Sequence, residues 1–201
     1  NDQKIINKRS VELMNLNDKR KKIETLILSN IDFKKIDEEN RDIIIYYNSN
    51  INEGLIGIIA ARLKDYFYKP AVVITNSGSV LKGSARSVYN YDIGRVIKNS
   101  FDKKLIINGG GHNMAAGFTL KKTKLDDFKK FVLNDFLYSS PSIINTFLYD
   151  SEVSPKAFNS DFYNDIQKIG PFGTGNPNPI FLFKDLKVIK VNILSHKHLS
   201  V

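Results

Sequence analysis

Hydrophobic residues recur at nearly helical intervals through the first 30 residues, which predicts a long amphipathic helix over residues 5–29. The residues on its apolar face are Ile6, Leu13, Leu16, Ile23 and Ile27. A basic run at residues 19–22 (Lys-Arg-Lys-Lys) falls within the same helix. Charged runs on helices usually face solvent, so we interpret this one as a solvated face.

The next segments alternate between strand-like and helix-like patterns. Residues 42–47 have the β-branched and aromatic content of a buried strand. Residues 54–66 place four apolar side chains on one helical face, and Pro70 separates that helix from a strand at residues 71–75. The polar residues 76–79 (Asn-Ser-Gly-Ser) predict a turn into a further strand.

This alternation continues to residue 137. We predict a helix over residues 92–99, a short strand over 105–108, a glycine loop at 109–111 and an amphipathic helix over 124–137. Repeated strand and helix segments favour an α/β fold, with helices packed on a mixed sheet. The aromatic residues of the last helix are interpreted as core.

Beyond residues 139–142 (Ser-Ser-Pro-Ser), which predict a domain boundary, the pattern is sparser. We predict a strand over 147–152, a helix over 161–169 and a longer strand over 186–194. The glycine- and proline-rich residues 171–179 predict a defined irregular path, with Phe172 as its buried anchor.

Composition favours a polyanionic partner. The chain has 30 Lys and Arg against 21 Asp and Glu, a formal net charge of +9. Such an excess is typical of nucleic-acid binders, but ribosomal and membrane-surface proteins share it. The absence of cysteine excludes disulfides and thiolate metal sites. No apolar run approaches the ~20 residues that span a bilayer, and no signal peptide opens the chain. The cytoplasm is therefore the expected location.

Two polar, glycine-bounded segments are predicted to be loops that together form an anion pocket. They are residues 83–87 (Gly-Ser-Ala-Arg-Ser) and 109–118 (Gly-Gly-Gly-His-Asn-Met-Ala-Ala-Gly-Phe). Glycines let a backbone approach a phosphate closely, while guanidinium and imidazole groups add directional donors. Taken singly, each segment also has a structural interpretation, namely a tight turn and a solvated arginine.

No complete metal site is expected. Two-metal phosphodiester hydrolysis needs several Asp and His ligands that hold ions roughly 3.5–4 Å apart. The three histidines are His112, His196 and His198, and the acidic pairs at residues 38–39 and 126–127 lie in polar stretches. The spacing of His196 and His198 could put two imidazoles on one face of a strand, but no third zinc ligand is evident.

The order of these motifs resembles a known family. Residues 83–87 and 110–118 resemble the DHH-associated C-terminal domain of the DHH phosphoesterase superfamily. Residues 53–63 and 69–74 fit the first helix and first core strand of that domain. Residues 169–181 (Ile-Gly-Pro-Phe-Gly-Thr-Gly-Asn-Pro-Asn-Pro-Ile-Phe) resemble a segment of the RecJ family of single-strand-specific DNA exonucleases.

The resemblance implies three regions. Residues 1–30 would be a connecting helix, residues 31–138 a DHH-associated substrate-binding domain with a mixed sheet flanked by helices, and residues 146–201 a partial OB-like β-barrel. A complete barrel of this type needs five strands, more than the pattern offers. The absent initial Met and the end at Val201 predict that the chain was cut from a longer polypeptide.

The resemblance also implies roles for individual residues. Arg86 and Ser84 would bind the phosphate at the 5′ side of single-stranded DNA, and His112 would act at the catalytic centre by donating to a phosphate oxygen. Backbone N–H groups of Gly110 and Gly111 would meet the same anion. Further candidates at the rim of this pocket are Ser87 and Asn113.

The family implies processive 5′-to-3′ exonuclease action in DNA repair and recombination. Mn²⁺ or Mg²⁺ would be bound by a DHH domain outside this sequence, so the isolated chain is expected to be inactive. Single-strand-binding protein and a helicase are expected partners, and no membrane is. Two alternatives remain open: a related phosphoesterase acting on oligoribonucleotides or nucleotides, and a non-catalytic nucleic-acid-binding fragment.

Overall fold

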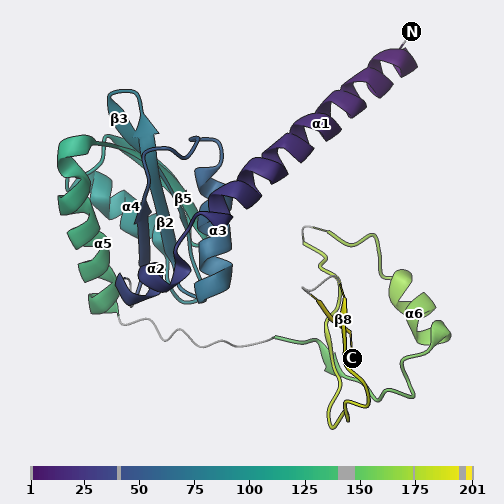
Figure 1. Cartoon of the computed structure of the whole chain (residues 1–201). Helices are drawn as coiled ribbons and strands as arrows, with labels where there is room; N and C mark the ends of the chain where they lie inside the picture. The colour runs from purple at the N-terminus through teal and green to yellow at the C-terminus, as the bar shows by residue number, and fades with distance from the viewer. Residues whose placement is uncertain (1, 40–41, 140–147, 174, 195–197, 201) are drawn as a thin grey trace. The chain divides into compact units, whose positions relative to one another are not determined.

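The chain forms two compact units, Asn1–Asn145 and Thr146–Val201 (Figure 1). The structure, a computed structural model, describes residues 2–39, 42–139, 148–173, 175–194 and 198–200. None of the helices within these residues combines the length and hydrophobicity of a membrane-spanning segment.

A five-stranded mixed sheet organises the first unit, with strand order β1-β2-β3-β5-β4. β1 runs parallel to β2, and the remaining neighbours are antiparallel. The strands are β1 (Ile44–Tyr47), β2 (Ala71–Ser77), β3 (Val80–Arg86), β4 (Asn108–His112) and β5 (Ala115–Lys121). The predicted α/β fold with a mixed sheet is confirmed.

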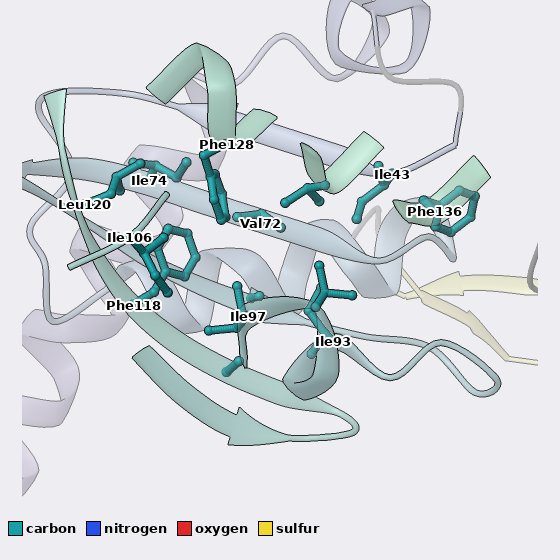
Figure 2. Packing of buried hydrophobic residues seen from close by; sticks show 14 of the residues in the cluster. Ile43, Val72, Ile74, Ile93, Ile97, Ile106, Phe118, Leu120, Phe128 and Phe136 are labelled. Atoms are coloured by element: carbon teal, nitrogen blue, oxygen red, sulfur yellow. The ribbon is translucent and has the colours of Figure 1, made fainter. Parts of the chain in front are cut away.

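Helices cover the sheet on both faces, and each face has its own apolar cluster. α4 (Ile93–Asp102) and α5 (Leu125–Ser139), the latter preceded by a 3₁₀ turn at Lys122–Lys124, cover one face. Figure 2 shows this larger cluster, in which the ring centroids of Phe118 and Phe128 lie 4.6 Å apart. α3 (Ile56–Phe67) and α2 (Phe33–Glu39) enclose the second cluster.

The long N-terminal helix, α1 (Asp2–Ser29), joins the second cluster through its final turns. Within that region Glu24 is buried and accepts a 2.7 Å hydrogen bond from Arg62 on α3. Arg20 approaches the same carboxylate at 3.5 Å. The other three residues of the predicted basic run are exposed, which agrees with a solvated face.

Three sequence predictions in this unit need correction. The strand predicted over residues 105–108 is wrong except at its last residue, because residues 105–107 bend and β4 begins at Asn108. The two predicted glycine loops are also strands, since residues 83–86 lie in β3 and residues 109–112 in β4. Glycine and polar residues favour loops by themselves, but here neighbouring strands pair with them on the sheet.

In the second unit the described strands are short. β6 (Ser151–Glu152) pairs with β7 (Phe181–Leu182), and β8 (Asn192–Leu194) pairs with β9 (His198–Ser200). The predicted strand over 186–194 is therefore wrong before residue 192. The predicted strand over 147–152 begins outside the described residues and is reduced to β6. The predicted helix is confirmed as α6 (Ser160–Gln167), capped by Asn159.

Side chains of this unit bury little surface. Phe158, Phe162, Phe181 and Phe183 form an aromatic cluster, but none of the described residues of the unit is buried. Phe172 is only half-buried, so its predicted role as a buried anchor is wrong. Residues 171–173 and 175–179 do follow an irregular path, tied by hydrogen bonds from Asn176.

Candidate nucleic-acid interface

Polar residues of β3 lie on the sheet face opposite the larger core cluster. Along this strand Leu81 and Ala85 are buried, whereas Ser84 and Arg86 are half-buried, as expected for side chains that alternate between faces. α3 packs against β2 and β3 on this second face. Farther along, the face carries exposed residues of β5 and β4. We call this part the open face, made up of Ser84, Arg86, Gly110, His112 and Gly117.

Strand register brings the predicted arginine and histidine to the same row of the sheet. Arg86 lies opposite Ala115, which in turn lies opposite His112. Directly opposed residues share a face, and two strand spacings separate Cα atoms by about 10 Å. The guanidinium and the imidazole therefore lie on either side of Ala115 in one row of the sheet.

Arg86 is positioned by its neighbours and carries a charge available to a ligand. Its Nη1 donates to Ser84 Oγ at 3.1 Å and to the Ala85 carbonyl at 2.9 Å. Gly57 of α3 leaves room for this arrangement, because a Cβ there would lie 3.1 Å from Arg86 Nη2. Among the ion pairs of the described residues, none involves Arg86.

Lys82, on the same side of β3, is already neutralised. Its Nζ lies 3.0 Å from Glu53 Oε2, and the hydroxyl of Ser77 donates to the same carboxylate oxygen at 2.6 Å. The Ser77 hydrogen bond, followed by the contacts with Lys82, lowers the pKa of Glu53. The acidic group therefore stays ionised, and Arg86 is the more available cation for an anion.

His112 presents one ring nitrogen to solvent. Its Nδ1 accepts a 3.3 Å hydrogen bond from the Met114 backbone N–H and lies 3.4 Å from Asn113 Oδ1. The two contacts require opposite protonation of Nδ1. We favour the hydrogen bond from the Met114 N–H, because the hairpin fixes this backbone donor. The side-chain amide of Asn113 can instead rotate by 180° and exchange its oxygen and nitrogen. This neutral tautomer carries its proton on Nε2, where it can be donated to a ligand.

The glycines divide between the two faces of the sheet. A Cβ at Gly110 would meet nothing within 4 Å, and one at Gly117 would meet only a backbone oxygen at 3.9 Å. Cβ atoms at Gly83 and Gly111 would instead overlap the Phe118 ring and the Ala115 backbone oxygen, respectively. Gly110 therefore belongs to the open face, whereas Gly83 and Gly111 are needed for close packing.

Two other candidate residues, Ser87 and Asn113, are not part of the open face. Ser87 is only 1% exposed, and its hydroxyl donates to the Tyr91 carbonyl at 2.6 Å. Ser87 thus joins the strand end to the following loop, and we leave it out of the proposed site. Asn113 is exposed in the turn after β4. Gly57 and Gly117 were not selected from sequence, although each lies within a segment that carries the family resemblance.

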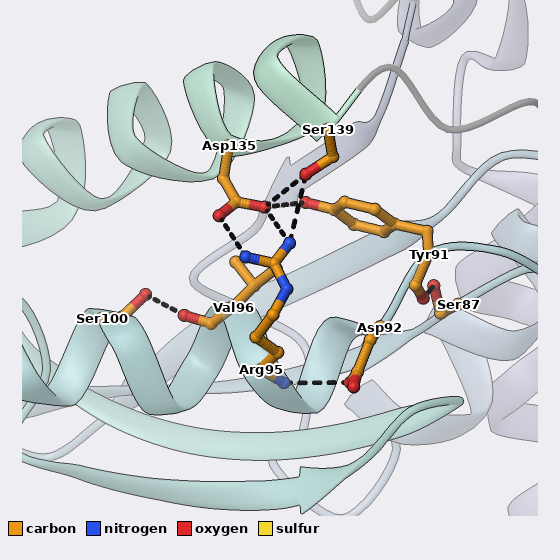
Figure 3. A network of polar contacts seen from close by, with 8 residues as sticks. All are labelled: Ser87, Tyr91, Asp92, Arg95, Val96, Ser100, Asp135 and Ser139. Carbon is orange, nitrogen blue, oxygen red and sulfur yellow. Dashed lines mark hydrogen bonds and ion pairs between the residues drawn. The ribbon is translucent and has the colours of Figure 1, made fainter.

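A polar network fixes α4 against α5 (Figure 3). Arg95 donates to both oxygens of Asp135, at 2.7 and 3.0 Å. The Tyr91 hydroxyl donates to the same carboxylate at 3.3 Å, and Tyr91 itself is 3% exposed. Burial, and next the negative charge of Asp135, raises the pKa of Tyr91 above its ordinary 10.0.

The raised pKa predicts a loss of stability at alkaline pH. Tyr91 in the unfolded chain loses its proton above pH ~10 while the folded state keeps it, so the stabilisation is complete below that pH and declines above it. Between pH ~10 and ~12, we expect the unfolding free energy of the wild type to fall more steeply with pH than that of Tyr91→Phe. The two slopes should differ by about 1.4 kcal/mol per pH unit. Urea unfolding across this range measures the slopes. Identical slopes would contradict the assignment.

The described residues do not fit a catalytic metal ion. They contain no group of three or more His, Asp or Glu residues placed to hold one. The acidic pairs at residues 38–39 and 126–127 are exposed, and the side chains of His196 and His198 lie outside the described part of the chain. We therefore derive no step through a metal ion bound by this chain.

Comparison with known proteins identifies both parts of the chain. The DHHA1 domain family matches residues 40–137, and the RecJ OB domain family matches residues 149–201. The chain thus carries a DHHA1 domain followed by a RecJ OB domain. Curated relatives of the chain are named as RecJ exonucleases, and the chain corresponds to a part of RecJ.

Curated relatives named RecJ align with most of the chain. The single-stranded-DNA-specific exonuclease RecJ of Escherichia coli is 26% identical over 202 residues, covering 94% of this chain and 34% of the relative. RecJ of Haemophilus influenzae is 29% identical over 144 residues, covering 69% and 25%. The chain therefore spans about a quarter to a third of the length of these relatives.

Solved structures agree on the fold. RecJ from Thermus thermophilus, in complex with Mn²⁺, aligns with a TM-score of 0.71 at 24% identity. The alignment covers 86% of this chain and 25% of that chain. The same protein has also been solved with Mg²⁺.

Proposed function

We propose that this chain is the substrate-binding part of a 5′-to-3′ exonuclease specific for single-stranded DNA. The observation that carries the proposal is the open face, where Arg86 and His112 lie in one row of the sheet beside side-chain-free Gly110. The names of the relatives supply the substrate class. The net charge of +9 suits a polyanionic substrate.

In this proposal the open face holds the phosphate at the 5′ side of the terminal nucleotide. Arg86 supplies a planar cation that can contact two phosphate oxygens, and Ser84 orients it. His112 donates from Nε2 to a further oxygen and stabilises charge that develops there during hydrolysis. Gly110 lets the phosphate approach the backbone closely.

Hydrolysis itself is assigned to residues outside this chain. The Thermus relative was solved with Mn²⁺ and with Mg²⁺, and the described residues here have no comparable ligand group. We expect this chain by itself to bind DNA without cleaving it. Interaction with single-strand-binding protein and a helicase, a role in repair and recombination, and a cytoplasmic location stay predictions.

Loss of the Arg86 guanidinium is expected to weaken binding of 5′-phosphorylated single-stranded DNA about tenfold or more, as charged hydrogen bonds typically contribute. The slope of log affinity against log salt concentration should decrease in magnitude by ~0.7 for each lost phosphate contact. His112→Ala should weaken binding less, because it removes a neutral donor. Fluorescence anisotropy of labelled oligonucleotides without divalent metal measures both quantities.

Arg9→Ala is a matched control for Arg86→Ala. It also removes one positive charge, but from an exposed pair with Glu12 on α1. Its effect should stay within about twofold, the range of general charge effects on a distant surface. Equal losses in the two variants would show that binding responds to net charge alone and would refute the proposed site.

A further inference from the structure

A groove runs along the free edge of the sheet, where β4 lies beside α4. Its volume is about 560 Å³. At one end the two elements are in close contact, since Ile93 N–H donates to the Asn113 carbonyl at 3.1 Å. A Cβ at Gly94 would lie 2.8 Å from the His112 oxygen, so this glycine permits the contact. β4 is an edge strand, and within the described residues its outer backbone groups face the groove without a partner strand.

One stripe of α4 gives the groove a cation and an aromatic ring. Gly94, Lys98 and Phe101 follow each other at intervals of four and three residues, so they lie along one side of the helix. All three line the groove. Lys98 is exposed, and Phe101 is 48% exposed.

The other charged residues of the groove already have partners. Arg95 is bound to Asp135, and the Asp92 carboxylate caps α4 by accepting from the Arg95 backbone N–H at 3.0 Å. Among the ion pairs of the described residues, none includes Lys98. On the α4 side of the groove, Lys98 and Phe101 are therefore the groups that remain for a ligand, with Cβ atoms about 5–6 Å apart.

We propose that this groove is a second nucleotide subsite, in which Lys98 contacts a phosphate and Phe101 stacks on a base. The inference rests on the proposed function, because the second subsite would hold nucleotides of the same DNA strand whose 5′ end binds at the open face. His112 borders both surfaces, and Gly110 leaves the edge of β4 uncovered between them. In this proposal the single-stranded DNA crosses the edge of β4 and enters the groove. An exposed ring beside a cation binds single strands of any sequence, since every base has a flat face.

The test compares ligands of two lengths on the full 201-residue chain. Phe101→Ala should weaken binding of a 5′-phosphorylated single-stranded decanucleotide about fivefold or more, the loss expected for one stacked base. Lys98→Ala should weaken it and reduce its salt dependence. Neither variant should change binding of a 5′-mononucleotide, which the open face holds alone. Competition titrations monitored by anisotropy give all of these affinities.

Matched controls are Tyr138→Ala, which removes a 91% exposed ring from α5, and Lys34→Ala on α2, which packs beside β1 at the opposite edge of the sheet. If Phe101→Ala and Lys98→Ala affect the decanucleotide no more than these controls, while Arg86→Ala still weakens it, the second subsite is refuted and the proposed function stands. If Arg86→Ala is also without effect, the proposed function fails first. Equal loss of mononucleotide and decanucleotide binding in Phe101→Ala would likewise overturn the subsite.

Discussion

Gly111→Ala is expected to destabilise the first unit by about 3 kcal/mol, at the upper end of what overpacking usually costs. A Cβ at this position would overlap the Ala115 backbone oxygen and would also lie 2.5 Å from the Ala116 Cα. Both obstacles belong to β5, which pairs with β3 on its other side. The β4–β5 hairpin cannot open to admit a methyl group without losing sheet hydrogen bonds. Urea unfolding followed by circular dichroism measures the loss.

Gly110→Ala is the matched control, one residue away on the same strand. Nothing lies within 4 Å of the added methyl group, and its backbone does not occupy the left-handed region. Alanine there should leave stability unchanged or raise it by about 0.4–1 kcal/mol through lower entropy of the unfolded chain. The methyl group would, however, stand on the open face and weaken DNA binding. Equal stabilities of the two variants would contradict the assignment of these glycines to opposite faces.

Hydrophobic periodicity was sufficient to predict α1, α3, α4 and α5 of the first unit, but the short helix α2 was not predicted. Leu55, Ile59 and Leu63 recur on one side of α3, and the structure buries that side. α4 and α5 likewise begin within one residue of their predicted starts. These segments follow the general rule that a regular apolar stripe long enough for several turns folds as a helix on a core.

The candidate site was only partly predictable. Arg86 and His112 were correctly brought to one surface, because the family resemblance linked their segments. The placement of His112 on a strand was missed, since the sequence of β4 contains three consecutive glycines and all of its residues are exposed. A strand with no apolar residue gives no alternating signal, and only pairing with β5 defines it. Because successive positions of a strand face opposite sides of the sheet, Gly110 then lies on the open face and Gly111 on the core face.

Prediction was least successful in the second unit. Apolar residues at 186, 188, 191 and 193 favoured one long strand, but pairing extends only over Asn192–Leu194 within the described residues. The side chains of Leu186, Val188, Val191 and Ile193 are all more than half exposed. Strand propensity reflects packing against neighbours, and these residues have no covered face to pack against within the described part of the chain.

Gly83→Ala is expected to cost about 3 kcal/mol of unfolding free energy, because the new Cβ would overlap the Phe118 ring. That ring cannot turn aside freely, since Phe128 of α5 packs against it in the centre of the larger cluster (Figure 2). The glycine at the start of the polar segment 83–87 therefore serves the core, while Ser84 beside it serves the open face. Urea unfolding monitored by circular dichroism measures the effect.

The partner substitution distinguishes this packing explanation from a general intolerance of alanine in β3. Phe118→Leu removes ring atoms from above Gly83 and should by itself destabilise the unit, as a cavity in a packed core does. In the double variant the methyl group added at position 83 occupies part of that space, so the two costs should be less than additive by at least about 1 kcal/mol. Strict additivity would mean that Gly83 is required for its backbone conformation instead of its contact with the ring. DNA binding by the double variant should approach that of wild type, because both substitutions lie on the face turned away from Arg86.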